Sequence, residues 1–119
     1  WEKRANAVFK KEKGNPERGE WSRKPGTPER WTSTYRHGQL NLSFKLALSS
    51  FKHVGLFPEQ AANWDYLAEH LPKFPDKPKV LNLFAYTGVA SLVARSCGAE
   101  VTHVDAVKQV ITWSRENME

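Results

Sequence analysis

The sequence predicts an α/β fold in which an antiparallel hairpin and a helix precede a β-α-β-α segment. Three patterns carry this prediction. Residues 40–48 alternate between large apolar side chains and polar or small ones, as a half-buried strand does. Residues 58–71 repeat apolar side chains at helical spacing behind a proline. Residues 80–105 hold an apolar run, a turn, a helical pattern and a second apolar run, which indicates two strands joined by a helix.

The composition allows one modest hydrophobic core. The chain has 119 residues, 39% hydrophobic and 12% aromatic, which is about one domain in length. It holds no secretory signal and no apolar run near the roughly 18 residues of a membrane span, and its single cysteine excludes an internal disulfide. We therefore expect a reduced, cytoplasmic setting. Because residues 111–119 have a helical pattern without a stop signal, we also expect a piece of a longer protein.

Residues 1–30 are expected to form a basic lead-in that proline and glycine interrupt. They hold nine Lys or Arg against five Glu, a net charge of +4 out of +5 for the chain. Residues 1–9 have a weak helical pattern, and residues 10–30 have the composition of a loop or linker. The cations favour a polyanion such as RNA, on whose unpaired bases Trp1, Trp21 and Trp31 would stack. A solvated lead-in whose tryptophans cover the edge of a core fits the same residues, because glutamates alternate with the cations.

Residues 31–79 are expected to form the hairpin, the helix and a short connector. Residues 31–35 and 40–48 predict the two strands, whose apolar face the following helix is the nearest element to cover. In that helix, Gln60 and Asn63 are three positions apart, so their amides can point into one pocket or form a polar rim. The buried stripe of the helix is expected at Ala61, Trp64, Leu67, Ala68 and Leu71.

The turn after residue 84 is the predicted ligand site. In a β-α-β unit this turn presents backbone N–H groups and a helix dipole to a ligand, and a carboxylate about 20 residues on holds ribose hydroxyls. Asp105 has that separation from Phe84, which suits an adenosine-bearing cofactor. Gly88 stands alone where a dinucleotide needs G-x-G-x-x-G, so a nicotinamide-dependent oxidoreductase is disfavoured. A plain α/β crossover without a ligand has the same spacing and remains open.

Two runs of residues resemble a known family. The run 81–88, LNLFAYTG, followed by Gly98-Ala99 and Val104-Asp105, is similar to motifs I and II of class I S-adenosylmethionine-dependent methyltransferases, closest to those that modify bases of ribosomal RNA. The run 55–64, GLFPEQAANW, is similar to the Phe/Tyr-x-x-Gln-x-x-Asn segment that precedes the cofactor domain in that group.

The resemblance implies a partial Rossmann-like methyltransferase unit (β-α-β-α) that starts at residue 80, is truncated at residue 119, and uses S-adenosyl-L-methionine. RNA, which is ribosomal RNA in the group that the chain resembles most, is the implied partner. The residues themselves predict neither a metal site nor a membrane span. Cofactor contacts are implied for Phe57, Gln60, Asn63, Phe84, Tyr86, Thr87, Gly88 and Asp105.

No catalytic residue is assigned, because the groups that act on the base lie on a later strand in the resembled family. We therefore expect the 119 residues alone to be inactive. The four histidines and one cysteine lack metal-ligand spacing. A non-catalytic RNA-binding or assembly module built on an α/β scaffold remains the alternative.

Overall fold

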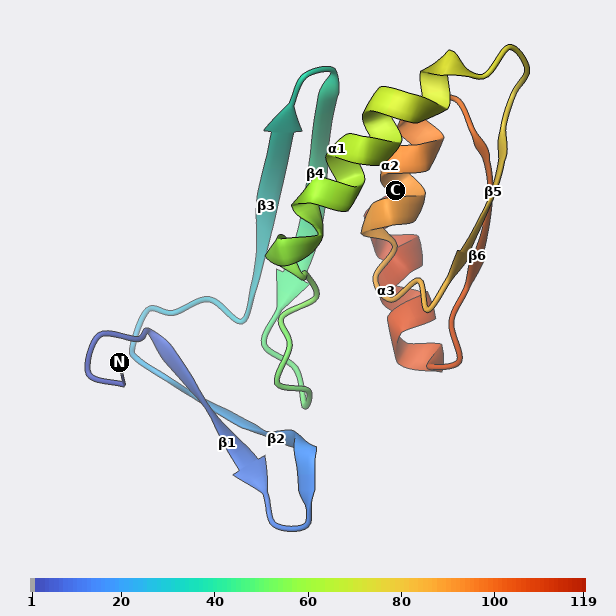
Figure 1. Cartoon of the computed structure of the whole chain (residues 1–119). Helices are drawn as coiled ribbons and strands as arrows, with labels where there is room; N and C mark the ends of the chain where they lie inside the picture. Colours follow the sequence, from blue (N-terminus) through green and yellow to red (C-terminus); the bar gives the residue numbers. More distant parts are fainter. Residues whose placement is uncertain (1) are drawn as a thin grey trace. The chain divides into compact units, whose positions relative to one another are not determined.

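The computed structural model describes residues 2–119, which form two compact units (Figure 1). The first unit holds the described residues up to Thr32 together with Lys45–Gly55. The second unit holds Ser33–Phe44 and Leu56–Glu119. Strands and helices are both present, so the predicted α/β class is confirmed.

The first unit is built on an antiparallel hairpin of β1 (Ala7–Glu12) and β2 (Asn15–Arg23). The expected helix at residues 1–9 is therefore wrong, as is the expected loop where β1 and β2 lie, whereas residues 24–29 are irregular as expected. Trp1 lies outside the described residues. Phe9 pairs with Trp21 across the hairpin, with ring centroids 5.2 Å apart. Trp21 Nε1 also donates to the carbonyl oxygen of Phe51 over 3.0 Å. In the structure, Trp21 therefore packs against Phe9 and hydrogen-bonds to Phe51 within the first unit.

Two glycines of this region are suited to a hairpin and do not mark a linker. Gly14 has a φ of 90° at the tip, where such a value favours glycine. Gly19 lies so close to β1 that a Cβ atom there would be 2.0 Å from the carbonyl oxygen of Lys10. The backbones of the two strands can pair at this register only because residue 19 has no side chain.

A second hairpin consists of β3 (Arg30–His37) and β4 (Leu40–Ala47), which confirms the alternation read from the sequence. Its part in the second unit packs on the following helix, as expected. Tyr35 meets Trp64 edge-on, with centroids 5.2 Å apart, and its hydroxyl donates to Asp65 over 2.7 Å. Phe44 is buried and also contacts the Trp64 ring.

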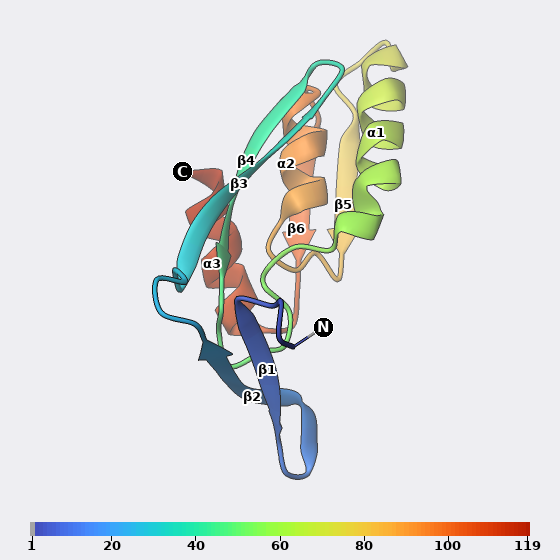
Figure 2. The ribbon, with the colours of Figure 1, turned by 90° about the vertical axis from the view of Figure 1, so that its left-hand side faces the viewer.

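The predicted helix over residues 58–71 is present as η1 (Pro58–Gln60), α1 (Ala61–His70) and η2 (Leu71–Lys73). Trp64 and Leu71 are buried on the expected stripe, and Leu67 is half-buried beside them. Figures 1 and 2 both show α1 running alongside α2 (Val89–Ser96). Leu71 shares a small apolar cluster with Ala94 of that helix.

The C-terminal part of the chain contains two parallel strands that pack against α2 (Figure 2). Strands β5 (Lys79–Leu83) and β6 (Glu100–Val104) pair in register, with Val80 opposite Val101. Val93 and Ala94 of α2 are fully buried. Helix α3 (Lys108–Met118) follows β6. These elements bring the end of β5, the start of α2 and the end of β6 together, and that junction is the candidate site.

Candidate functional site

The turn between β5 and α2 has an unusual backbone. Phe84 and Tyr86 have φ values of 55° and 50°, in the left-handed region that non-glycine residues seldom occupy. Such residues cost on the order of 1–3 kcal/mol each and persist where the surroundings hold them. Here β6 holds the turn, because the Ala85 N–H donates to the carbonyl oxygen of Val104 and the Tyr86 N–H donates to Asp105 Oδ2, over 3.0 and 2.9 Å.

A cavity of about 510 Å³ opens beside this turn in the second unit. Its volume is within the usual range for small-molecule sites, roughly 300–1,000 Å³. Five of the eight residues that the sequence singled out line it: Phe57, Gln60, Phe84, Tyr86 and Thr87. The wall is therefore made by the segment before α1 and by the turn, which are far apart in the sequence.

Aromatic rings dominate the part of the wall that the turn provides. The Phe57 and Tyr86 rings contact each other with centroids 5.1 Å apart and an interplanar angle of 49°. Phe84 is 93% exposed, which is extreme for a phenylalanine. Thr87 lines the cavity but is fully buried, so its hydroxyl group is not accessible to solvent.

The other three expected residues, Asn63, Gly88 and Asp105, lie beside the cavity and do not line it. Asn63 Nδ2 donates to Gln60 Oε1 over 2.8 Å, so the two amides meet on one face of the helix as their spacing predicted. Gly88 precedes α2 with a φ of 93°. A Cβ atom at Gly88 would lie 3.2 Å from the Ser114 Cβ atom, so α3 closes the space behind it.

Asp105 braces the turn with both carboxylate oxygens. Oδ2 accepts from the Tyr86 N–H and Oδ1 accepts from the Val107 N–H, each over 2.9 Å. A carboxylate offers about four lone-pair sites, so each oxygen retains one for another donor. The spacing in the sequence pointed to a ligand, and it carried no sign of these backbone contacts.

Sequence reasoning also missed a contact from α3. Asn117 Nδ2 donates to the carbonyl oxygen of Thr87 over 2.9 Å. The two residues are 30 positions apart, and only the packing of α3 behind the turn brings them together. No pattern within the helix distinguishes Asn117 from an ordinary polar position.

Comparison with known proteins identifies relatives of this chain. No protein-family model matches it. It is 33% identical over 79 residues to a protein of Magnetococcus marinus named ribosomal RNA large subunit methyltransferase K/L, a match that covers 66% of this chain and 10% of the relative. The protein of the same name from Shewanella frigidimarina is 40% identical over 78 residues, with 62% and 10% covered.

A solved structure extends the similarity to the whole chain. It is described as a SAM-dependent methyltransferase from Agrobacterium tumefaciens, is 43% identical in sequence, and superposes on 98% of this chain with a TM-score of 0.81. The chain is thus related to the S-adenosylmethionine-dependent methyltransferases. The resemblance seen in the sequence is confirmed. The chain spans about a tenth of the length of the curated relatives it matches and 35% of the solved methyltransferase.

Residues 2–119 hold neither a candidate metal site nor a candidate membrane span. Among residues 2–119, no group of three or more His, Cys, Asp or Glu side chains could hold a metal ion. Within the same range, no helix is long and apolar enough to cross a membrane.

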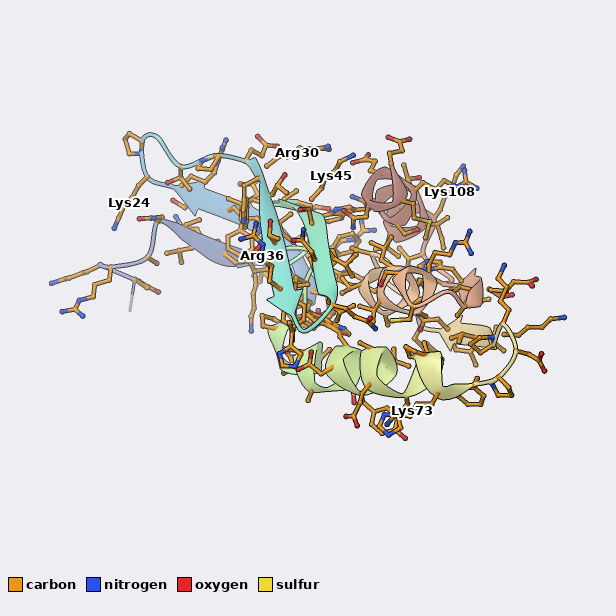
Figure 3. The ribbon with its side chains drawn as sticks, turned by 90° about the horizontal axis from the view of Figure 1, so that it is seen from above. Lys24, Arg30, Arg36, Lys45, Lys73 and Lys108 are labelled. Carbon is orange, nitrogen blue, oxygen red and sulfur yellow. The ribbon has the colours of Figure 1, made fainter. Side chains whose placement is uncertain are left out.

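The basic side chains of this methyltransferase relative are spread over several elements. In the second unit, Figure 3 shows Arg36 on β3, Lys73 just after α1 and Lys108 at the start of α3, apart from one another. In the first unit, Lys52 forms an ion pair with Glu17 over 2.6 Å. The basic excess of the sequence therefore includes cations that acidic neighbours already partner.

Proposed function

We propose that this chain supplies part of the S-adenosylmethionine site of a methyltransferase that modifies a base of RNA, with ribosomal RNA as the substrate. The observation that carries the proposal is the cavity beside the turn, which gathers Phe57, Gln60, Phe84, Tyr86 and Thr87 in a chain 43% identical to a SAM-dependent methyltransferase. The curated relatives, named for methylation of the large ribosomal subunit RNA, supply the substrate class.

The residues beside the cavity fit the proposed cofactor. S-adenosylmethionine has no phosphate, so the single Gly88 of the turn suffices where a dinucleotide would need three glycines. The amide of Gln60 lines the cavity and can hydrogen-bond a carboxylate or an ammonium group, because it has both donors and an acceptor. Asp105 retains lone pairs for ribose hydroxyls while its other lone pairs hold the turn.

The architecture fits the same proposal. The order β5, α2, β6, α3 with parallel strands is that of the first part of a Rossmann-like unit, and residues 31–79 would form the part that precedes it. When bound, S-adenosylmethionine carries an already activated methyl group, so the contribution of the protein is largely to orient the reactants. No residue of this chain is assigned a catalytic role. A cytoplasmic location belongs to this proposal.

A titration of ¹⁵N-labelled protein with S-adenosylmethionine tests the cofactor assignment. We expect the amide signals of Gln60, Asp105 and residues 84–88 to shift saturably, and NAD at the same concentration to leave them in place. The Gln60→Ala variant should bind about fivefold more weakly, as the loss of one hydrogen bond implies. Gln109→Ala makes the same change at an exposed position of α3 and should bind like the parent.

The titration also separates this function from the alternative. If the amide signals do not shift with S-adenosylmethionine, and the protein binds RNA with an affinity that falls steeply as salt increases, a non-catalytic RNA-binding module would be favoured. A larger response to NAD than to S-adenosylmethionine would point to a nucleotide-dependent oxidoreductase.

A further inference from the structure

Three polar side chains from β5, α2 and β6 form a hydrogen-bonded chain behind the turn. Asn82 Nδ2 donates to Ser91 Oγ over 2.9 Å. Ser91 Oγ in turn lies 2.9 Å from His103 Nδ1. Ser91 is only 2% exposed, and the other two residues are half-buried. Buried polar groups cost free energy unless they are hydrogen-bonded. The hydrogen bonds among these three side chains offset that cost.

The Asn82 amide fixes one direction in this network. An amide NH₂ group can only donate, so Ser91 Oγ accepts from Asn82. The Ser91 hydroxyl can either donate to His103 Nδ1 or accept from it, and the direction depends on the tautomer of the imidazole. We expect Nδ1 to be the acceptor, in which case a neutral imidazole carries its proton on Nε2.

The Cε1 edge of the imidazole, between the two nitrogens, faces Gly88 of the turn. A Cβ atom at Gly88 would lie 3.5 Å from His103 Cε1. Within the described residues, His103 Nε2 is buried without a hydrogen bond of good geometry. Burial lowers the pKa of His103, while the Asp105 charge and the nearby Tyr86 backbone partly offset this shift. The lowered pKa favours the neutral form of the ring, which lies against the backbone of the turn.

His103 lies on β6 and Asp105 directly follows that strand, two positions further on, where residues continue to point to the same side if the chain stays extended. Asp105 holds the N–H of Tyr86, and His103 lies against the same stretch of backbone. Tyr86 has the left-handed conformation that needs support from its surroundings. The two side chains together confine the strained residue of the turn.

We propose that His103 is a positioning residue of the turn at residues 84–88, held in place by Ser91 and Asn82. Its connection to cofactor affinity rests on the proposed function, in which this turn contacts S-adenosylmethionine. The network transmits the position of the sheet and of α2 to the backbone that lines the cavity. His103 itself does not line that cavity.

The matched pair Ser91→Ala and Ser96→Ala tests the proposal. Both changes remove a hydroxyl group from α2, but Ser96 Oγ donates to the carbonyl oxygen of Val93 in its own helix and lies 4.0 Å from Sγ of the adjacent Cys97, away from the turn. We expect Ser91→Ala to shift the Tyr86 to Gly88 amide signals and speed their hydrogen exchange. It should also weaken S-adenosylmethionine binding about five- to tenfold. Ser96→Ala should change neither. Ser91→Thr keeps the hydroxyl and should restore the parent values.

The ring is tested independently by its own nitrogen signals. In the parent, the ¹⁵N shifts of His103 should show the Nε2–H tautomer with Nδ1 as acceptor, and Ser91→Ala should move the Nδ1 signal. His103→Asn, which keeps a partner for Ser91 but cannot reach the turn, should loosen the turn as Ser91→Ala does. Each effect is compared with the melting temperature, because a general loss of stability would not single out the turn.

The outcomes separate the inference from the proposed function. If the parent protein does not bind S-adenosylmethionine, the proposed function fails, and the exchange rates of the turn amides still decide the inference. If Ser91→Ala and His103→Asn leave those amides and the affinity as in the parent, the positioning role of His103 is overturned.

Discussion

The Asp105→Asn substitution is the most direct probe of how the turn is held. An asparagine has one acceptor oxygen where the aspartate has two, so either the Tyr86 N–H or the Val107 N–H loses its partner. The new NH₂ group also faces that N–H, and two donors repel. A hydrogen bond to a charged group contributes roughly 1.5–3 kcal/mol. Because Asp105 is only half-buried, we expect a loss of about 1–2 kcal/mol.

For a chain of this size, that loss corresponds to a fall in melting temperature of roughly 4–10 °C. Thermal unfolding followed by circular dichroism measures it, and NMR shows whether the amides of Tyr86 and Val107 exchange faster. Asp76→Asn is the matched control, because Asp76 is exposed in the connector before β5. Exposed substitutions of this kind change stability within about 0.5 kcal/mol. Equal stability of the two variants would refute the bracing role of Asp105.

Three further predictions concern the hairpin, the histidine and activity. Gly19→Ala should destabilise the first unit by about 1–3 kcal/mol, because the new Cβ atom would clash with the Lys10 carbonyl oxygen. Hydrogen exchange in β1 and β2 measures this loss. Ser22→Ala, at an exposed position of β2, is the control. Since burial lowers the pKa of His103 in the folded state, its contribution to stability is present above pH 6.5 and is lost as the pH falls through the folded pKa. The free energy of unfolding, measured with urea, should be lower at pH 5.5 than at pH 7.5, and the difference should be smaller in His103→Asn. An equal difference in both proteins would contradict this prediction. The isolated 119 residues should transfer no methyl group to ribosomal RNA, and measurable incorporation of labelled methyl would show that the chain holds a complete substrate site.

The elements that sequence reasoning predicted share a strong local signal. The alternation of large apolar residues with polar or small ones over residues 40–48 suits a strand with one buried face, and β4 occupies residues 40–47. The helix over residues 58–71 follows from Pro58 and the Trp64 stripe, and it is found with short 3₁₀ turns at both ends. Local pattern sufficed because each segment buries one face against the next segment along the chain.

The first hairpin was missed because its stability comes from few and distant contacts. Strands β1 and β2 are mostly exposed, so they lack the apolar alternation that identifies a strand. The Phe9 and Trp21 rings form its apolar contact, and Trp21 is tied to Phe51, 30 residues away. A close approach at Gly19 completes the pairing. None of these features is visible in a window of ten residues.

The role of the expected site residues stays a prediction, and no pattern in the sequence indicated how the turn is held. The motif pointed to the turn and to Asp105, and the structure places a cavity against that turn. The side chains that hold the turn from behind, Ser91, His103 and Asn117, come from three elements and carry no local signature. Residues that touch a ligand recur in motifs, whereas residues that support a backbone are defined by tertiary packing.

The spacing between Phe84 and Asp105 has two physical explanations that act together. A carboxylate about 20 residues after the first strand suits a ribose, and the same carboxylate here holds the N–H of the strained Tyr86. Spacing alone therefore cannot distinguish a ligand-binding aspartate from a bracing one. The two roles differ in what Asp105→Asn changes. If Asp105 only braced the turn, affinity for S-adenosylmethionine would fall no further than in Ser91→Ala, which loosens the same turn without altering the carboxylate. If Asp105 also holds the ribose, affinity falls further by the value of the hydrogen bonds to the sugar, about tenfold for each 1.4 kcal/mol.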